Sequence, residues 1–330
     1  MTSARRLAAA LSVALSFGVG ACGGEEAGSA REPAQSGSET AARTVRHAMG
    51  TTEIVGRPER VVVLDTGELD SAVALGVTPV GAVEAIAGAG FPAYLADAVK
   101  GVETVGTIEQ PSVEAIAALQ PDLILSSKLR HESIYDQLSQ LAPTVFTEEV
   151  GVAWKENFGL HAEALGRTEE AERLGREYQR KIAAFREAMG DRRAGTEASV
   201  VRSVGDEVRI YLKESFIGTI LEDAGLSRPG PQDVEDFSAT ATRETIPDLD
   251  GDVMFVARYG DDHRLLETLM DSPLWDRLEV VRSERLYRVP DDLWFLGIGN
   301  LAARLVVDDL ERILVAGERL PGDEPAVATG

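Results

Sequence analysis

Short apolar runs alternate with amphipathic segments along the first half of the chain. Arg60 to Asp65 is a β-branched, apolar run typical of a buried parallel strand. Glu68 to Leu75 has helical spacing and is stopped by Gly76, and Val77 to Gly81 has the pattern of a second strand. The same order returns in a helix expected over 111–119 and a buried strand expected over 123–125. This alternation predicts βαβ units around a parallel sheet.

The middle of the chain has a longer, helical period. From Trp154 to about Met189 the pattern predicts a long helix, with Thr168 capping its second half and Gly190 following its end. Apolar residues in that second half lie three and four positions apart and form one stripe. The residues of the stripe are Ala171, Leu174, Tyr178, Ile182, Phe185 and Met189.

Beyond this helix the alternation resumes. Strands are expected over 199–204, 208–212 and 253–256, and helices over 216–224 and 300–315. We therefore predict an α/β protein in which two α/β lobes with parallel-type sheets are joined by a single long helix. The predicted boundaries are 51–152 for the N-terminal lobe, 153–195 for the connecting helical segment, 196–320 for the C-terminal lobe and 321–330 for a loose tail.

The two predicted lobes share a sequence echo. When residues 112–123 are placed above residues 242–253, Glu, Ile, Leu and Asp recur at one constant offset without a gap. Glu114 then stands over Glu244, each shortly before an expected strand. Two such lobes with a rigid connector predict a cleft with approximate two-fold symmetry.

The first residues have the features of an export signal. Residues 1–21 contain Arg5 and Arg6 followed by an apolar run that has signal-peptide length and is too short to span a bilayer. The sequence around Cys22 is similar to a bacterial lipobox, so we predict lipidation of this cysteine. The single cysteine also excludes intramolecular disulfides. Residues 22–50 read as a flexible, lipid-anchored tether, which predicts a location on the extracytoplasmic face of the cell membrane.

The net charge of the chain limits the classes of ligand and partner that it can bind. The 330 residues include 33 Lys and Arg against 55 Asp and Glu, and the net charge of −22 argues against nucleic acid. Basic side chains nevertheless gather at or after predicted strands, where open α/β sheets bind ligands. A carboxylate or phosphate ligand would suit the planar fork of arginine. The residues of this group are Lys128, Arg130, His131, Arg202, Arg209, Lys213 and Arg258, together with Tyr211 on the same strand face as Arg209.

Several segments resemble the iron-siderophore substrate-binding proteins of ABC importers, which are periplasmic binding proteins of the helical-backbone class. These segments are 60–81, 126–138, 142–145, 208–211 and 272–275, and the likeness extends from about Arg57 to Val315. It is strongest for the branch that binds citrate-hydroxamate or carboxylate siderophores. The resemblance implies two α/β lobes, one long connecting helix and no catalysis.

The resemblance also implies partners and roles. Glu114 and Glu244 match the glutamates that dock onto a permease dimer, and Trp294 joins the weaker ligand-binding candidates Tyr211 and Arg258. The loop 106–111 lacks the arginine of some hydroxamate-binding relatives, which favours a negatively charged, carboxylate-bearing ferric complex. The siderophore brings its own iron ligands, so we expect no cofactor and no metal site in the protein, and we expect a monomer.

Other functions are less consistent with these patterns. A haem or corrinoid carrier of the same fold is the nearest alternative, although haem needs an axial ligand in an apolar cleft. The four histidines are scattered, which disfavours direct zinc or manganese capture. Residues 297–302 fit G-x-G-x-x-A but lead only into a final helix, so they do not predict nucleotide binding. A secreted lipoprotein enzyme lacks a visible nucleophile and base, and a purely structural lipoprotein would not need clustered cations.

Overall fold

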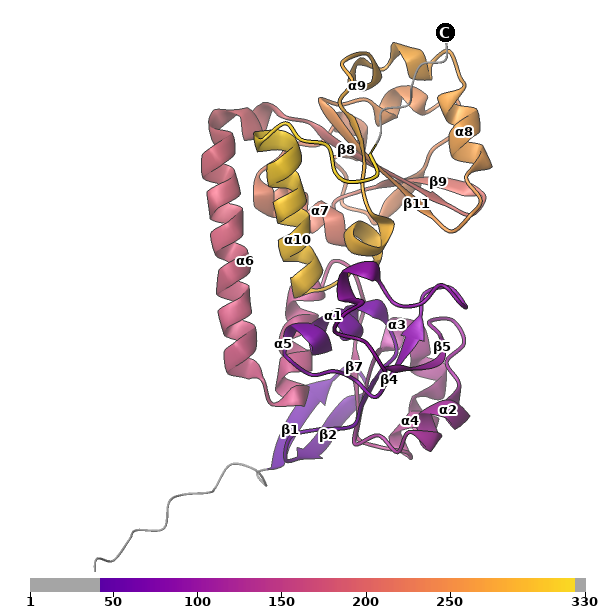
Figure 1. Ribbon diagram of the computed structural model, residues 1–330, viewed down its shortest axis with the longest axis vertical. Coiled ribbons are helices and arrows are strands. Elements are labelled where there is room, and N and C mark those ends of the chain that lie inside the picture. The colour runs from indigo at the N-terminus through magenta and orange to yellow at the C-terminus, as the bar shows by residue number, and fades with distance from the viewer. Residues whose placement is uncertain (1–41, 324–330) are drawn as a thin grey trace, which may run out of the picture. The chain divides into compact units, whose positions relative to one another are not determined.

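A computed structural model describes residues 42–323, in which two five-stranded sheets are each flanked by helices (Figure 1). The first sheet has the order β5-β4-β3-β6-β7, and all its pairings are parallel. Its strands are β3 (Val61–Val63), β4 (Gly81–Glu84), β5 (Glu103–Thr107), β6 (Leu123–Ser127) and β7 (Thr144–Thr147). Its helices are α1 (Thr66–Ala74), α2 (Val113–Ala118), α3 (Lys128–His131) and α4 (Tyr135–Ser139). We call this part the N-terminal lobe.

The second sheet has the order β10-β9-β8-β11-β12 and is mixed. Its strands are β8 (Ala198–Val204), β9 (Glu207–Tyr211), β10 (Ser238–Thr240), β11 (Val253–Tyr259) and β12 (Leu286–Arg288). β9 runs antiparallel to both β8 and β10, because Gly205, with φ +58°, closes a tight hairpin between β8 and β9. Its helices are α7 (Phe216–Ala224), α8 (Arg264–Met270), α9 (Glu279–Arg282) and α10 (Asn300–Leu310). This part is the C-terminal lobe.

The sequence echo corresponds to equivalent positions in the two sheets. β6 lies beside β3 at the centre of one sheet, and β11 lies beside β8 at the centre of the other. The echoed Asp122 accepts hydrogen bonds from the backbone N–H groups of Glu59 and Arg60 just before β3. Asp252 accepts one from the N–H of Glu197 just before β8. The two aspartates therefore fix the entry to the central strand of each lobe in the same way.

Both faces of each sheet are buried, as parallel strands require. Val61 and Val63 belong to one apolar cluster and Val62 to another on the opposite face. In the C-terminal lobe, Val200 and Val201 divide in the same manner between two clusters. This burial explains why the central strands read as continuous apolar runs rather than as alternating ones.

The connector consists of two helices, α5 (Trp154–Leu165) and α6 (Thr168–Met189), the second of which has 22 residues. The predicted single helix over 154–189 is therefore interrupted, because Gly166 takes a left-handed conformation with φ +66° and ends α5. Thr168 does not cap α6, whose preceding residue is Arg167. The stripe itself is confirmed: Leu174, Tyr178, Ile182, Phe185 and Met189 are buried, and Ala171 is partly buried.

Three predicted boundaries are corrected. The strand expected over 77–81 begins only at Gly81. The tether predicted to reach residue 50 ends earlier, because β1 (Ala42–His47) pairs with β2 (Gly50–Val55) in an antiparallel hairpin. At the other end, Asp323 is buried and accepts a hydrogen bond from Arg319, so the tail does not begin at 321. The predicted signal peptide and Cys22 lie outside the described residues.

The lobes meet where α1 approaches the start of α10. Both carboxylate oxygens of the buried Asp70 in α1 accept backbone hydrogen bonds, at 3.0 Å from Leu301 N and 2.8 Å from Ala302 N. A residue of one lobe thus satisfies the free N–H groups at the start of a helix in the other. Gly299 lets the chain pass close to Asp70, since a Cβ at this position would lie 2.2 Å from its carboxylate.

Candidate ligand-binding site

A pocket of about 220 Å³ lies between the carboxyl-terminal ends of the two sheets. Asp65 lies between β3 and α1, and Arg130 lies on α3 after β6, whereas Arg202 and Arg209 lie on β8 and β9. Ligands in open α/β sheets bind beyond these strand ends. We call this cavity the interlobe pocket, and it combines three arginines with aromatic and aliphatic walls.

On the N-terminal side, Arg130 is held by Asp65, the second residue after β3. Its Nε donates to Asp65 Oδ2 at 3.0 Å, and its side chain is 38% exposed. Asp65 also caps α1, because its other oxygen accepts the Thr66 N–H at 2.7 Å. Among the described residues, the two terminal nitrogens of Arg130 make no hydrogen bond, so they are free to donate to a ligand.

On the C-terminal side, Arg202 is buried, and each of its three side-chain nitrogens makes a hydrogen bond within the protein. Its Nε and one terminal nitrogen donate to the two oxygens of Asp291, each at 2.6 Å, and the other donates to the Tyr211 hydroxyl at 3.0 Å. Its guanidinium also lies over the rings of Tyr259 and Phe295. Burial disfavours the charged form, but Asp291 outweighs this effect and raises the pKa of Arg202. Arg202 therefore stays charged and holds Asp291 and Tyr211 in position.

Arg209 stands next to Arg202, because the two residues are direct partners in the β8–β9 pairing. Like charges opposite each other destabilise a sheet unless they are neutralised. Arg209 donates through Nε to Glu207 at 2.8 Å, and its side chain is 35% exposed. Its terminal nitrogens, like those of Arg130, have no hydrogen bond within the described residues.

Aromatic side chains form the wall beside these arginines. Tyr211 makes edge-to-face contacts with Phe237 and Phe295, at centroid distances of 5.3 and 4.7 Å. Phe237 is 45% exposed at the mouth of the pocket. Trp294 also lines the pocket, although its indole is buried and donates to Asp309. A ligand here would meet both charge and apolar surface.

Four predicted binding residues do not line the interlobe pocket: Arg258, described below, and Lys128, Lys213 and His131. Lys128 pairs with Glu148 at 2.8 Å, and Lys213 pairs with Glu235 at 2.5 Å. His131 is buried: Nδ1 lies 2.7 Å from Ser126 Oγ and Nε2 lies 2.6 Å from the Ile108 carbonyl oxygen. Burial lowers the pKa of His131, which favours the neutral ring. These residues follow strands as predicted, but their side chains turn toward acidic neighbours or the core.

Arg258 lines a second cavity of about 330 Å³ that shares Leu296 with the interlobe pocket. Asp291 also lines this cavity, and the neighbouring Tyr259 donates to the Ala85 carbonyl at 3.2 Å. A hydrogen bond thus links the two lobes next to Arg258. Arg258 lies at the end of β11, just after the strand expected over 253–256. Its side chain does not line the interlobe pocket with the three arginines.

Sequence reasoning missed the acidic residues of the site. It searched for cations, whereas Asp65 and Asp291 set the position of Arg130 and Arg202. The sequence could have indicated Asp65, because this residue stands between a buried strand and the start of a helix, where a capping residue is expected. Asp291 precedes the helical turn Asp292–Leu296 and Phe237 lies in an irregular segment, and the approach of both to the pocket depends on the tertiary fold.

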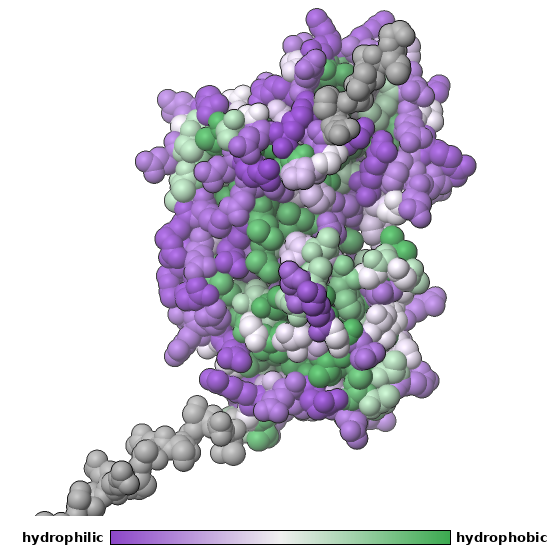
Figure 2. Space-filling view, in the orientation of Figure 1, coloured by the Kyte–Doolittle hydropathy of each residue, from purple (hydrophilic) through white to green (hydrophobic). Residues whose placement is uncertain are grey.

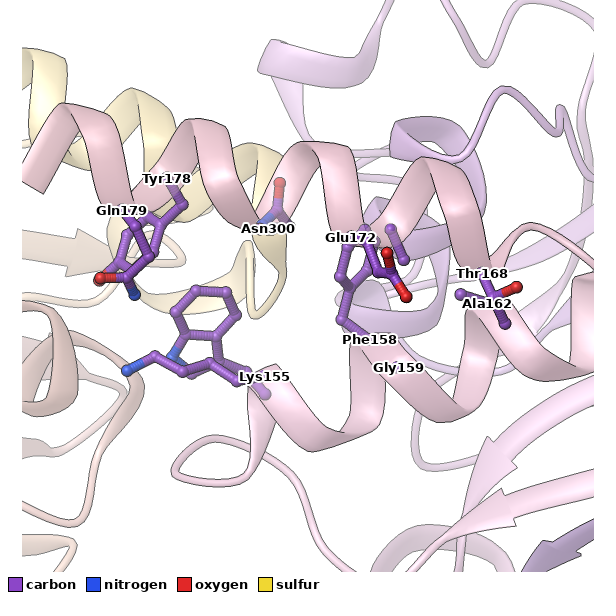
Figure 3. Close-up of a pocket in the computed structure, with 12 residues that line it drawn as sticks. Lys155, Phe158, Gly159, Ala162, Thr168, Glu172, Tyr178, Gln179 and Asn300 are labelled. Carbon is purple, nitrogen blue, oxygen red and sulfur yellow. The ribbon is translucent and has the colours of Figure 1, made fainter. Parts of the chain in front are cut away.

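A larger cavity of about 480 Å³ lies in the groove between α5 and α6 (Figure 3). Figure 3 shows Phe158 from α5 and Tyr178 from α6 beside it, with Lys155 and Gln179 near one end. It shares no lining residue with the interlobe pocket and lies away from the strand ends. In Figure 2, apolar surface is visible in the middle of the view, beside the polar face of α6. We assign the ligand site to the interlobe pocket, because it combines three arginines with strand ends, whereas the groove between α5 and α6 is lined mainly by residues of those two helices.

Two further properties concern residues 42–323. No helix in this range is both long and apolar enough to cross a bilayer. No three His, Cys, Asp or Glu side chains in the same range are grouped as a metal site would require.

Two lobes, a helical connector and a pocket at facing strand ends define a solute-binding protein. The periplasmic binding protein family model matches residues 61–293, and the chain belongs to this family. It is 38% identical over 305 residues to the "Probable siderophore-binding lipoprotein YfiY" of Bacillus subtilis, covering 88% of this chain and 92% of that protein. It is 32% identical to the "Achromobactin-binding periplasmic protein" of Dickeya dadantii, covering 78% and 86%.

The fold has a solved counterpart. The crystal structure of Staphylococcus aureus SirA complexed with staphyloferrin B superposes with a TM-score of 0.75 and 35% sequence identity. The match covers 82% of this chain and 98% of that one. The predicted fold of two α/β lobes with one long helix is thereby confirmed.

Proposed function

We propose that this protein is an extracytoplasmic binding protein that captures an anionic ferric siderophore in the interlobe pocket and delivers it to an ABC importer. The observation that carries the proposal is the pair Arg130 and Arg209, one on each lobe, whose terminal guanidinium nitrogens are uncommitted within the described residues. Relatives with similar sequences along most of the chain are named for siderophores.

Each arginine can act as one arm of a clamp. An oxyanion of the ligand would accept two parallel hydrogen bonds from the free edge of a guanidinium, the geometry that favours arginine over lysine. Asp65 and Glu207 orient the two forks through the Nε atoms. Arg202 does not donate to the ligand in this account; it holds Tyr211 and Asp291 in place behind the clamp.

The charge balance of the pocket favours a ligand of modest negative charge. Asp65, Asp291 and Glu207 each offset one of its three arginines. Phe237 and Phe295 add apolar surface. A ferric chelate with one or two exposed carboxylates and apolar or amide-bearing arms fits this surface better than a polyanion covered with charge.

A binding titration tests the function. Tryptophan fluorescence of the protein is recorded while ferric schizokinen, ferric citrate or haem is added, since Trp294 lines the pocket. The proposal expects saturable quenching by at least one ferric chelate, with a Kd in the micromolar range or below. Saturable binding of haem, with no response to either ferric chelate, would reject it and favour a haem carrier.

Delivery to a two-fold permease would use the echoed glutamates. Glu114 lies in the first turn of α2 and Glu244 precedes Ile246, and both are exposed on equivalent parts of the two lobes. Because the lobes repeat one architecture, one glutamate on each can meet one subunit of a permease dimer. In cells, Glu114→Ala with Glu244→Ala should spare ligand affinity and reduce iron uptake. Undiminished uptake would refute the docking role.

The membrane anchor follows from the first residues. Lipidation of Cys22 would tether the chain near its permease, and export would be directed by residues 1–21. Cys22→Ala should release the protein from the membrane fraction without changing its ligand affinity. Retention of the variant in that fraction would contradict the anchor.

A further inference from the structure

Four titratable side chains lead from the interlobe pocket into the core. Arg130 contacts Asp65 at 3.0 Å, and Glu68 lies one helical turn after Asp65 in α1. Behind it, Glu68 Oε1 is 3.8 Å from His161 Nε2 of α5. Glu68 and His161 are each only 2% exposed. The account of ligand binding above uses Arg130 and Asp65 but gives Glu68 and His161 no role.

The inner pair is poorly satisfied. Glu68 Oε2 and both ring nitrogens of His161 lack hydrogen-bond partners among the described residues. Buried polar atoms without partners cost free energy, and most of them are paired in folded proteins. A leucine at either position would avoid this cost, so stability alone does not account for a carboxyl and an imidazole here.

The charged and titratable side chains around Glu68 affect whether its carboxyl group is ionised. Asp65 caps its helix and Asp70 lies within it, while Arg130 approaches from α3 and His161 from α5. Tyr94, from the turn Ala93–Leu95, and Arg304 of α10 act on Asp70. Burial and the nearby Asp65 raise the pKa of Glu68 to about 8, and burial lowers that of His161 to about 3. Between these values the pair holds one proton and has no net charge.

We propose that Glu68 is a positioning residue for anion binding, which by staying neutral leaves Asp65 as the single negative charge behind Arg130. This inference rests on the proposed function. Ionised Glu68 would add a second negative charge one turn behind the clamp, where it attracts Arg130 and repels an anionic ligand in a poorly screened interior. An anionic ligand in turn favours protonated Glu68, so binding and proton uptake are linked.

The pH profile of affinity tests this role. Ferric schizokinen is titrated into the wild-type protein, Glu68→Gln and the exposed-site control Glu103→Gln between pH 6.5 and 9. Wild-type and Glu103→Gln affinities should fall roughly tenfold above pH 8, the size of effect expected from one added buried charge. Glu68→Gln should keep its affinity at pH 9. Titration of the chelate itself would affect all three proteins equally and cancels in the comparison.

Calorimetry keeps the test decisive if Glu68→Gln does not fold. Binding heats of the wild-type protein at pH 8 are compared in two buffers with different ionisation enthalpies. Net proton uptake on binding supports the role of Glu68, and proton release or no exchange overturns it. If every protein binds but the pH profiles coincide, only the role of Glu68 is rejected. If no protein binds ferric schizokinen at pH 6.5, both this inference and a schizokinen-type ligand are rejected.

Discussion

The two lobes bring arginine to the interlobe pocket in different ways. The N-terminal lobe supplies Arg130 from a short helix after β6 and anchors it on Asp65. The C-terminal lobe places Arg202 and Arg209 side by side on adjacent strands. Of these two, Arg202 is buried and each of its side-chain nitrogens makes a hydrogen bond, whereas Arg209 is partly exposed and its terminal nitrogens make none within residues 42–323. A cation at a strand end is thus a ligand group only if its hydrogen bonds are not already used.

Arg202, which holds neighbouring side chains in place, and Arg209, which we propose binds the ligand, should differ in how much stability is lost when their acidic partners are removed. The larger loss is expected at Asp291, the partner of Arg202. Asp291→Ala should destabilise the protein by about 3–5 kcal/mol, because it leaves the charge of Arg202 buried without its partner. Urea unfolding monitored by circular dichroism measures this effect. Glu207→Ala, which removes the half-exposed partner of Arg209, is the matched control and should cost far less. Equal losses of stability in the two variants would contradict the different roles given to Arg202 and Arg209.

His131 extends the comparison within the N-terminal lobe. His131→Ala should destabilise the protein by about 1–3 kcal/mol, because it leaves Ser126 and the Ile108 carbonyl without their partner. Ligand affinity of the folded variant should be retained, in contrast to substitution of the neighbouring Arg130. Denaturant midpoints and fluorescence titrations on the same samples separate the two effects. A loss of affinity with intact stability would return His131 to the binding site.

The smallest effects are expected at the lysines outside the pocket. Lys128→Ala and Lys213→Ala should change ligand affinity by no more than about twofold, because both side chains are only partly exposed, lie outside the pocket and form ion pairs with exposed acidic residues. The titration used for the wild-type protein is sufficient. A tenfold loss in either variant would mean that the lysine leaves its ion pair to bind the ligand.

Much of the fold follows from local pattern. The apolar runs around Val61 and Leu123 identified the central strands, and the helix over 216–224 was predicted with its observed bounds. The interruption at Gly166 was missed, although Gly166 and the polar residues 167–170 separate the apolar residues of α5 from those of α6. The direction of β9 was also missed, since a strand reads the same whether its neighbour is parallel or antiparallel.

The binding site was only partly accessible to sequence. Position in or after a strand indicated Arg130, Arg202 and Arg209, which line the pocket, but it could not separate them from Lys128 or Lys213. The separation depends on ion pairs such as Lys128 with Glu148, whose partners are distant in sequence. The net charge of the chain did not indicate the binding site, because each arginine of the pocket has its own nearby carboxylate.

The clamp formed by Arg130 and Arg209 is tested most directly by removing both arms. The affinity of Arg130→Ala with Arg209→Ala for the ferric chelate that the wild-type protein binds is measured beside that of Arg282→Ala, an exposed arginine outside the pocket. Each lost charge-assisted hydrogen-bonding group is expected to weaken binding about tenfold to a hundredfold. The double variant should therefore bind at least about a hundredfold more weakly than Arg282→Ala. Wild-type affinity in the folded double variant would contradict the account.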